Sequence, residues 1–415
     1  MKSKKVTKYD FFFELAEKVF TVFTLFVSSG AVIVTTLLPQ GGSGEVEGSP
    51  LFQLMWFCIY AITLFLITIQ WRGFTRIPNN LDLPVLLLVG IALFSYFWSD
   101  VPQLTLRRSI ALVGTTLFGV YFATRYHPKQ QLRLLAWTFG IAAVLSVIFA
   151  LFLPSYGLDV YPFAGVWRGV YQQKNLLGRY MVLSSTIFML TSFVYRNYRW
   201  ILLTIFSLSI ALILLSTSKT SLIVLLTLLV LIPIYKTLHW GYTKFLPLSI
   251  ITVLIIASFA ILITSEAETI LGFFGKDVTL TGRTQLWVAV IEMIKQHPWL
   301  GYGYSAFWLG NEGASTSVWA VIGWPAPHAH NGFLDLWLDL GLLGVLVFVI
   351  SYLKSFIKAL NFVRYGQSWE DLWPILYLTF ILLLNISQSA LLHRNSIIWI
   401  LYVAINLHKP MQIYR

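Results

Sequence analysis

Two histidines separated by one residue, His328 and His330, end a long polar stretch and are followed directly by Asn331. A neutral imidazole can take a proton from a hydroxyl group, and general-base catalysis of this kind typically accelerates a reaction by about 10² to 10⁴. His330 stands just before an apolar run, which places its imidazole at the mouth of a helical bundle. We interpret His330 as a candidate base, with Asn331 either orienting it or capping the following helix.

Two acidic residues, Asp335 and Asp339, lie one and two turns further along the same face of that helix. For Asp335 a favourable charge near a helix N-terminus and a role in substrate binding are both open. His328, His330 and Asp335 are also potential metal ligands. Histidines two residues apart outside a strand do not converge on one ion without further ligands, however, and the sequence has no other His/Cys cluster. We therefore expect neither a metal nor another cofactor.

The elements that must position these residues are apolar helices. Of the 415 residues, 57% are hydrophobic, 16% aromatic and 11% charged, and many apolar runs approach the roughly 20 residues needed to cross hydrocarbon as a helix. The sequence predicts an all-α, polytopic integral membrane protein with about twelve transmembrane helices. The apolar runs lie at 17–38, 51–70, 82–98, 105–123, 133–153, 176–194, 200–215, 221–235, 245–264, 332–353, 372–390 and 396–408.

These helices form two membrane parts around one long loop. Residues 1–264 predict a membrane bundle of about nine helices, 265–330 a large extracytoplasmic loop, and 331–415 about three further helices. Within the loop, Arg283–Gln296 predicts an amphipathic helix that lies along the membrane surface or packs over the bundle. The apolar positions expected on its one side are Leu286, Trp287, Val290, Ile291 and Ile294.

The distribution of basic residues gives the orientation. Short loops rich in Lys and Arg stay cytoplasmic, and the basic N-terminal segment followed by strict alternation puts both termini inside and the long loop outside. The net charge of +12 is mostly explained by this asymmetry and does not indicate nucleic-acid binding. The single cysteine, Cys58, excludes internal disulfides and a cysteine metal cluster.

Basic residues on the outward side are exceptions to this rule. A ring of such cations beside His328 and His330 suits an anionic ligand such as a lipid-linked diphosphate, with about 1.5 to 3 kcal/mol from each charge-assisted contact. Some of them, Arg107 and Arg108 included, could instead extend to lipid phosphates. The outward basic residues are Arg107, Arg108, Arg168, Lys174, Arg179, Lys219, Lys276, Arg283, Lys295 and Arg394.

An ordered set of short motifs resembles the O-antigen ligase and polysaccharide polymerase superfamily, particularly its exopolysaccharide-polymerase-like branch. The resemblance covers roughly residues 80–405. Each motif alone is weak, whereas the ordered set is fairly specific. The motifs are Trp167-Arg168-Gly169, Lys174-Asn175-Leu176-Leu177-Gly178-Arg179, Ser216-Thr217-Ser218-Lys219-Thr220, Gly282-Arg283-Thr284-Gln285-Leu286-Trp287, His297-Pro298-Trp299-Leu300-Gly301-Tyr302-Gly303 and His328-Ala329-His330-Asn331-Gly332-Phe333-Leu334.

The resemblance implies a C-type glycosyltransferase of the bacterial inner membrane. Such an enzyme moves a glycan from undecaprenyl diphosphate to a sugar hydroxyl of a glycan or glycolipid acceptor on the outward face, with inversion and without a metal. His330 would be the base, and Arg168 and Arg283 would hold the diphosphate. Other polysaccharide-assembly proteins are further candidate partners. The residues assigned to substrate binding are Arg168, Lys174, Lys219, Arg283, His328, Asn331 and Arg394.

Two positions depart from the family pattern, and two questions stay open. Lys219 stands where relatives commonly have Arg, so a single ammonium charge replaces a guanidinium that can contact a phosphate with two N–H groups. Gln173 stands where relatives often have His. A polymerase and a ligase differ only in their acceptor, which no residue decides. A transporter or flippase of lipid-linked oligosaccharides is the alternative from another class. Transporters often have two related halves with broken helices, whereas the polar residues here gather in asymmetric outward loops.

Overall fold

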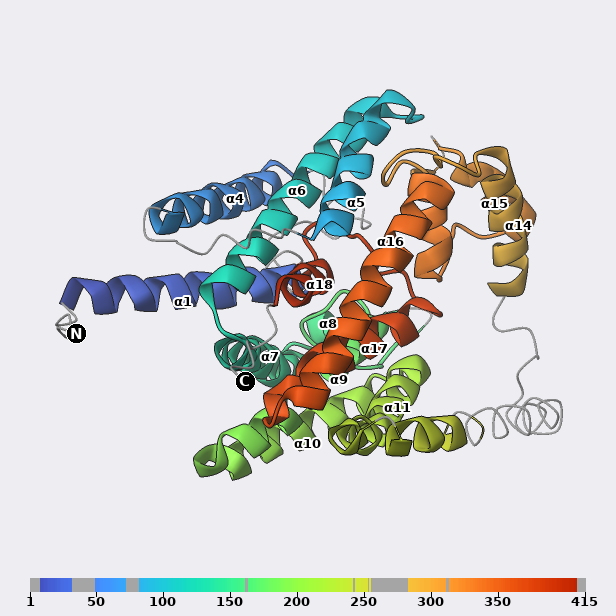
Figure 1. Cartoon of the computed structure of the whole chain (residues 1–415). Helices are drawn as coiled ribbons and strands as arrows, with labels where there is room; N and C mark the ends of the chain where they lie inside the picture. The colour runs from blue at the N-terminus through green and yellow to red at the C-terminus, as the bar shows by residue number, and fades with distance from the viewer. Residues whose placement is uncertain are drawn as a thin grey trace.

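The structure, a computed structural model, is built almost entirely of helices (Figure 1). It describes residues 8–31, 49–71, 82–160, 163–241, 243–252, 254, 283–310 and 313–408. Within these ranges there is no β-strand, and the nearest approach to one is an isolated bridge between Leu158 and Trp167. The all-α prediction is confirmed for this part of the chain.

In the part of the chain that the structure describes, six helical segments are long and apolar enough to cross a membrane, so the chain is a multi-pass membrane protein. The predicted number of twelve spans is not confirmed, because the other helices are shorter or more polar, and the run at 245–264 lies largely outside the described residues. The six segments involve α4 (Pro50–Trp71), α7 (Pro128–Phe152), α9 (Lys174–Val194), α10 (Arg199–Leu215), α11 (Lys219–Lys236) and α16 (Gly332–Tyr365). The other main helices are α1 (Lys8–Ser28), α5 (Leu83–Phe94), α6 (Pro102–Arg125), α14 (Arg283–Gln296), α15 (Ser315–Ile322), α17 (Trp373–Asn385) and α18 (Ile397–Leu407).

Helices α9, α17 and α18 form the centre of the bundle. Almost every residue of α17 and α18 is buried, and α9 packs against α7, α10 and α11. Small residues permit close approach between apolar helices: Ser184 of α9 lies 2.7 Å from Ser209 of α10, hydroxyl to hydroxyl, and a Cβ at Gly119 of α6 would press on Val403 of α18. This tight centre fixes the helix ends that bear the polar residues.

Basic residues gather at one end of the bundle. Tyr195, just after α9, donates a hydrogen bond to the carbonyl of Lys129 in the first turn of α7. Phe193 of α9 stacks on Trp369, and Lys236 of α11 lies over the same indole. We call this the basic end, and the opposite end of α16, where His328 and His330 lie, the histidine end. The grouping agrees with the predicted alternation of loops, while its assignment to the cytoplasm stays a prediction. The basic end is defined by Arg125, Lys129, Arg133, Arg196, Arg199, Lys236 and Arg364.

Helix α14 has the predicted bounds and packs over the bundle. It contacts α15 and α16, and its buried side chains share a core with Leu338 of α16. The predicted apolar side is largely right, but Ile291 is 42% exposed, and Ala289 and Met293 are buried instead. Of the two placements predicted for this helix, packing against protein is therefore the observed one.

Helix α16 is kinked where a loop inserts into it. Gly341 has a φ of 66°, a left-handed conformation within the helix. The loop takes up main-chain groups around the kink: Tyr302 N–H donates to Leu338 O at 2.7 Å, and Leu342 N–H donates to Pro298 O at 2.8 Å. A Cβ at Gly341 would clash with the main chain of Trp299. The motif at 297–303 thus ties the outer loop to the helix that follows the histidines.

Candidate functional site at the histidine end

His328 and His330 lie against one another in the loop that leads into α16. The His330 main-chain N–H donates to His328 Nδ1 at 3.1 Å, and the ring centroids are 4.1 Å apart. Because Nδ1 accepts, a neutral His328 has its proton on Nε2. His330 has a φ of 51°, a conformation that costs an ordinary residue about 1 kcal/mol. Within the described ranges, neither ring nitrogen of His330 makes a hydrogen bond, so its imidazole is available to a substrate.

The residue between the histidines is fixed at both of its main-chain groups. The Ala329 N–H donates to Asp335 Oδ1 at 3.0 Å, and Ala329 O accepts from Trp287 Nε1 at 2.9 Å. Asp335 also accepts from Trp308 Nε1 at 2.7 Å and from the Ser389 hydroxyl. Asp335 therefore holds the histidine loop in place, a role that its position near the helix N-terminus alone did not reveal.

Asn331 is the N-cap of α16. Its Oδ1 accepts from the N–H groups of Phe333 at 3.0 Å and Leu334 at 3.2 Å, as an N-cap side chain does. Capping, one of the two roles considered from the sequence, is thus observed. At the next residue, Gly332, a Cβ would clash with the side chain of Asn385, so α16 can begin this close to the end of α17 only with glycine there.

Both imidazoles favour the neutral form. Burial lowers the pKa of His330 to about 4, and the positive charge of Arg283 contributes to the same shift. Burial also holds the pKa of His328 well below its usual range, with further contributions from His330 and Arg179. A neutral imidazole is the form that accepts a proton.

Arg283 brings an unpaired positive charge to this loop. It is the first residue of α14, one turn before Trp287, so one helix places both side chains beside the histidines. The guanidinium is half-buried and has no hydrogen-bond or ion-pair partner in the described part of the chain. Burial lowers its pKa. An arginine in this state is suited to bind a phosphate group, which it can contact with two N–H groups at once.

Arg179 is a second cation near the histidines, absent from the residues that we assigned to substrate binding. It lies in α9, is 9% exposed, and its Nε donates to Gln388 Oε1 at 2.7 Å. The sequence does contain an indication of it, since a charged residue within an apolar helix is costly and commonly functional. Gln388 has no such indication. It neighbours Ser389, whose hydroxyl bonds to Asp335, so the loop after α17 supports Arg179 and the histidine loop together.

Arg394 and Arg108 converge on a neighbouring segment. Arg394 NH1 donates to Ser305 Oγ at 3.1 Å, and its main-chain N–H donates to the Tyr304 hydroxyl at 3.2 Å. Arg108 NH1 donates to the carbonyl of Ser305. Arg394 is therefore part of a cluster with its own protein partners, and its predicted contact with substrate stays a prediction.

Three further residues were predicted to bind substrate, Arg168, Lys174 and Lys219. Arg168 donates to the carbonyls of Tyr156 at 3.0 Å, Ser155 at 3.2 Å and Gln172 at 3.3 Å, so its guanidinium braces its own loop. Their assigned roles in substrate binding are untested predictions.

Lys174 and Lys219 lie at the starts of α9 and α11, close to that loop. Lys174 Nζ donates to Thr217 Oγ1 at 3.2 Å and lies 3.7 Å from the ring centroid of Phe163. Lys219 is exposed. Lys276 lies outside the described residues. In the described ranges, no three His, Cys, Asp or Glu residues form a potential metal site, and the expectation that no metal takes part stays a prediction.

Comparisons with known proteins agree with the resemblance seen in the motifs. A model of the O-antigen ligase family matches residues 202–349, a segment that contains Arg283 and both histidines. The chain is also similar to the exopolysaccharide production protein ExoQ of Rhizobium meliloti (strain 1021), at 28% identity over 281 residues. That match covers 65% of this chain and 63% of ExoQ, so the chain spans less than two thirds of the relative's length. Together, the two matches show that this multi-pass membrane protein is similar to O-antigen ligase/polymerase-like proteins.

Proposed function

We propose that the protein is a glycosyltransferase that moves a glycan from undecaprenyl diphosphate to a sugar hydroxyl at the outer face of the bacterial inner membrane. The family supports a role in surface or exopolysaccharide biosynthesis. The observation that carries the finer proposal is the imidazole of His330, which burial keeps from protonation by lowering its pKa and which makes no hydrogen bond among the described residues, beside the guanidinium of Arg283, which has no partner in the same part of the chain. A base for a hydroxyl and a cation for a diphosphate are the two groups that this reaction needs.

In the proposed reaction, a ring nitrogen of His330 takes the proton of the acceptor hydroxyl. The oxygen attacks the anomeric carbon, the bond from that carbon to the diphosphate oxygen breaks, and undecaprenyl diphosphate leaves with the electron pair. Arg283 stabilises the negative charge that develops on the leaving group. A single in-line displacement inverts the anomeric centre.

Donor binding also strengthens the base in this scheme. The charge of Arg283 lowers the pKa of His330 in the free protein. A diphosphate beside Arg283 offsets that charge and raises the pKa of His330, because a nearby anion favours the protonated imidazole. Burial, the larger cause of the low pKa, remains, but the donor makes His330 a stronger base than it is in the free protein.

The test uses purified protein in detergent with a defined undecaprenyl-diphosphate oligosaccharide, and identifies the product by mass. A lengthened lipid-linked chain indicates a polymerase, and transfer to a different lipid indicates a ligase. We expect His330→Ala to lower turnover by about 10² to 10⁴ while the protein stays inserted and monodisperse. Wild-type turnover in this variant would remove His330 from the mechanism.

The same assay distinguishes the alternative function. A transporter or flippase of lipid-linked oligosaccharides moves its substrate between two compartments and leaves its mass unchanged. Product formation in detergent, where there is one compartment and no gradient, supports a transferase. An unchanged donor, with every candidate acceptor present, would favour transport.

A further inference from the structure

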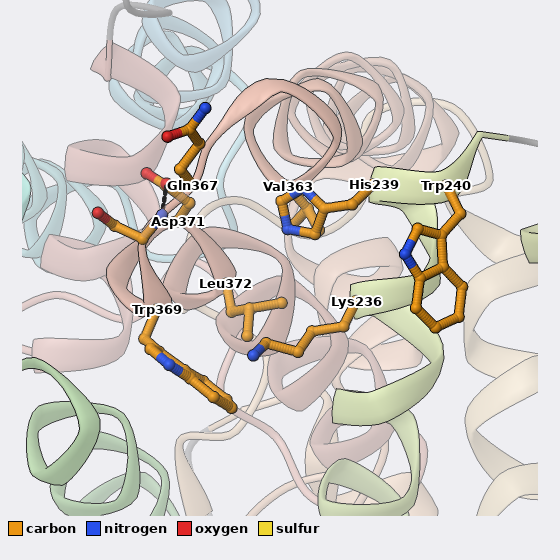
Figure 2. Close-up of a pocket in the computed structure, with 9 residues that line it drawn as sticks. Lys236, His239, Trp240, Val363, Gln367, Trp369, Asp371 and Leu372 are labelled. Atoms are coloured by element: carbon orange, nitrogen blue, oxygen red, sulfur yellow. Dashed lines mark hydrogen bonds between the residues drawn. The ribbon is translucent and has the colours of Figure 1, made fainter.

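A cavity of about 420 Å³ lies at the basic end, at the far end of α16 from the histidines. It is open on one side and is lined by the end of α11 with the short helix η3 (Thr237–Trp240), by Val363 near the end of α16, and by the short helix η6 (Trp369–Leu372) (Figure 2). The proposed transferase reaction makes no use of this cavity.

One wall of the cavity presents an ammonium group that has no acidic partner. Lys236 Nζ lies 2.9 Å from the centroid of the Trp369 ring, and that ring stacks on Phe193 with centroids 4.0 Å apart. Lys236 takes part in no hydrogen bond or ion pair within the described ranges. A cation–π contact holds the ammonium but does not neutralise its charge, and the three N–H donors remain for a ligand.

The other polar groups of the cavity leave this charge uncompensated. Asp371 is the acid in the lining, but its Oδ2 accepts from the Ser368 N–H at 2.9 Å and it is beyond ion-pair distance of Lys236. Figure 2 shows Asp371 beside Gln367, with the Lys236 side chain extending toward Trp369 and Leu372. His239 also lines the cavity. This chemistry suits an anionic phosphate group, which would accept hydrogen bonds from the Lys236 ammonium.

The position of the cavity indicates a ligand held by the membrane. Lys236 and Trp240 end the apolar segment Lys219–Trp240, which is long enough to cross a bilayer, so the cavity opens at the level of lipid headgroups. Trp240 is 66% exposed. An exposed apolar stripe runs along α11 toward it, formed by Ile223, Leu226 and Val230, at a spacing that places them on one side of the helix. An acyl chain can lie along this stripe while its headgroup enters the cavity.

We propose that this cavity binds the headgroup of an anionic phospholipid. The phosphate oxygens accept hydrogen bonds from Lys236, and the acyl chains follow α11. Basic residues of the same end, Arg196, Arg199 and Arg364 among them, attract such lipids to this surface. Lys236 differs from a lysine that only extends to the lipid surface. Its ammonium lies over the Trp369 ring, and both residues line the cavity.

The test measures the thermal midpoint of the purified protein in detergent during titration with phosphatidylglycerol or phosphatidylcholine. We expect phosphatidylglycerol to raise the midpoint more. Lys236→Gln should raise the half-saturating phosphatidylglycerol concentration about fivefold, because one Lys near a lipid surface contributes about that much. Lys236→Arg should preserve the preference. Lys129→Gln is the matched control: Lys129 is exposed at the same end but does not line the cavity.

Two results would overturn the proposal. One is an unchanged preference for phosphatidylglycerol in Lys236→Gln, or an equal loss in Lys129→Gln, which would indicate attraction by the surface as a whole. The other is full stabilisation by inorganic phosphate or glycerol phosphate in phosphatidylcholine, which would identify a soluble anion as the ligand. Glycan transfer is not needed for either readout, so the proposal stands or falls independently of the transferase assignment.

Discussion

Replacement of Asp335 tests whether this carboxylate positions the histidine loop or takes part in chemistry. Its oxygens accept hydrogen bonds from Ala329 N–H, Trp308 Nε1 and the Ser389 hydroxyl. Asp335→Ala leaves these three donors without an acceptor, and the two N–H donors alone, at about 1 to 3 kcal/mol each, give roughly 2 to 6 kcal/mol. Asp335→Asn keeps one oxygen for the two N–H donors, and the Ser389 hydroxyl can rotate to accept from the new amide. We expect the Asn variant to lose about 1 kcal/mol.

In the transfer assay these energies predict a graded series. If the loss acts on the placement of His330, Asp335→Asn should lower turnover by up to about tenfold, and Asp335→Ala by roughly 30-fold or more. The thermal midpoint of each variant separates misplacement of the loop from unfolding of the bundle. Asp335→Asn as inactive as Asp335→Ala, at an unchanged midpoint, would refute the reasoning, because only a group that accepts or donates a proton in the reaction distinguishes Asp from Asn so sharply.

Three further predictions concern the base, the cation and the kink. Burial lowers the pKa of His330 to about 4, so only about 0.1% of the imidazole is protonated at pH 7. We therefore expect kcat/KM to be constant from pH 7 to about pH 5 and to fall as the pH passes through about 4. An inflection near pH 6.5 would contradict this. Arg283→Gln should raise the KM for the donor by roughly 10- to 150-fold. Lys295→Gln is the control, because Lys295 is paired with an exposed acid of the same helix, and it should leave this KM unchanged. Equal effects of the two variants would show that Arg283 does not bind the diphosphate. Gly341→Ala should lower the thermal midpoint more than Gly323→Ala, since both glycines have positive φ but only the first would clash with main chain; equal losses would mean that the inserted loop can move aside.

The helices and part of the site could be predicted because they depend on local sequence. Apolar runs located most of the bundle helices, and the period of apolar side chains gave the bounds of α14. The N-cap at Asn331 follows from the polar residue before an apolar run. The motifs predicted that His330 and Arg283 of α14 serve one site, and in the structure the charge of Arg283 acts on His330.

The rest depends on contacts between segments distant in sequence. Nothing near Arg168 indicates that its guanidinium is taken by carbonyls of residues more than ten positions away. The partnership of Arg179 with Gln388 joins residues 209 positions apart. The run at 332–353 was predicted as one span, whereas α16 continues to Tyr365 and is kinked at Gly341, where the inserted 297–303 loop takes up main-chain groups. Such partners are set by tertiary packing.

Helix α14 links two properties of the candidate site that would otherwise vary separately. Arg283 affects the proton affinity of His330, and Trp287, one turn later, holds the carbonyl of Ala329 beside that histidine. A rigid displacement of this one helix therefore alters the basicity and the aim of the imidazole simultaneously. A ligand that wedges between α14 and α16 would disturb both without contacting the imidazole itself.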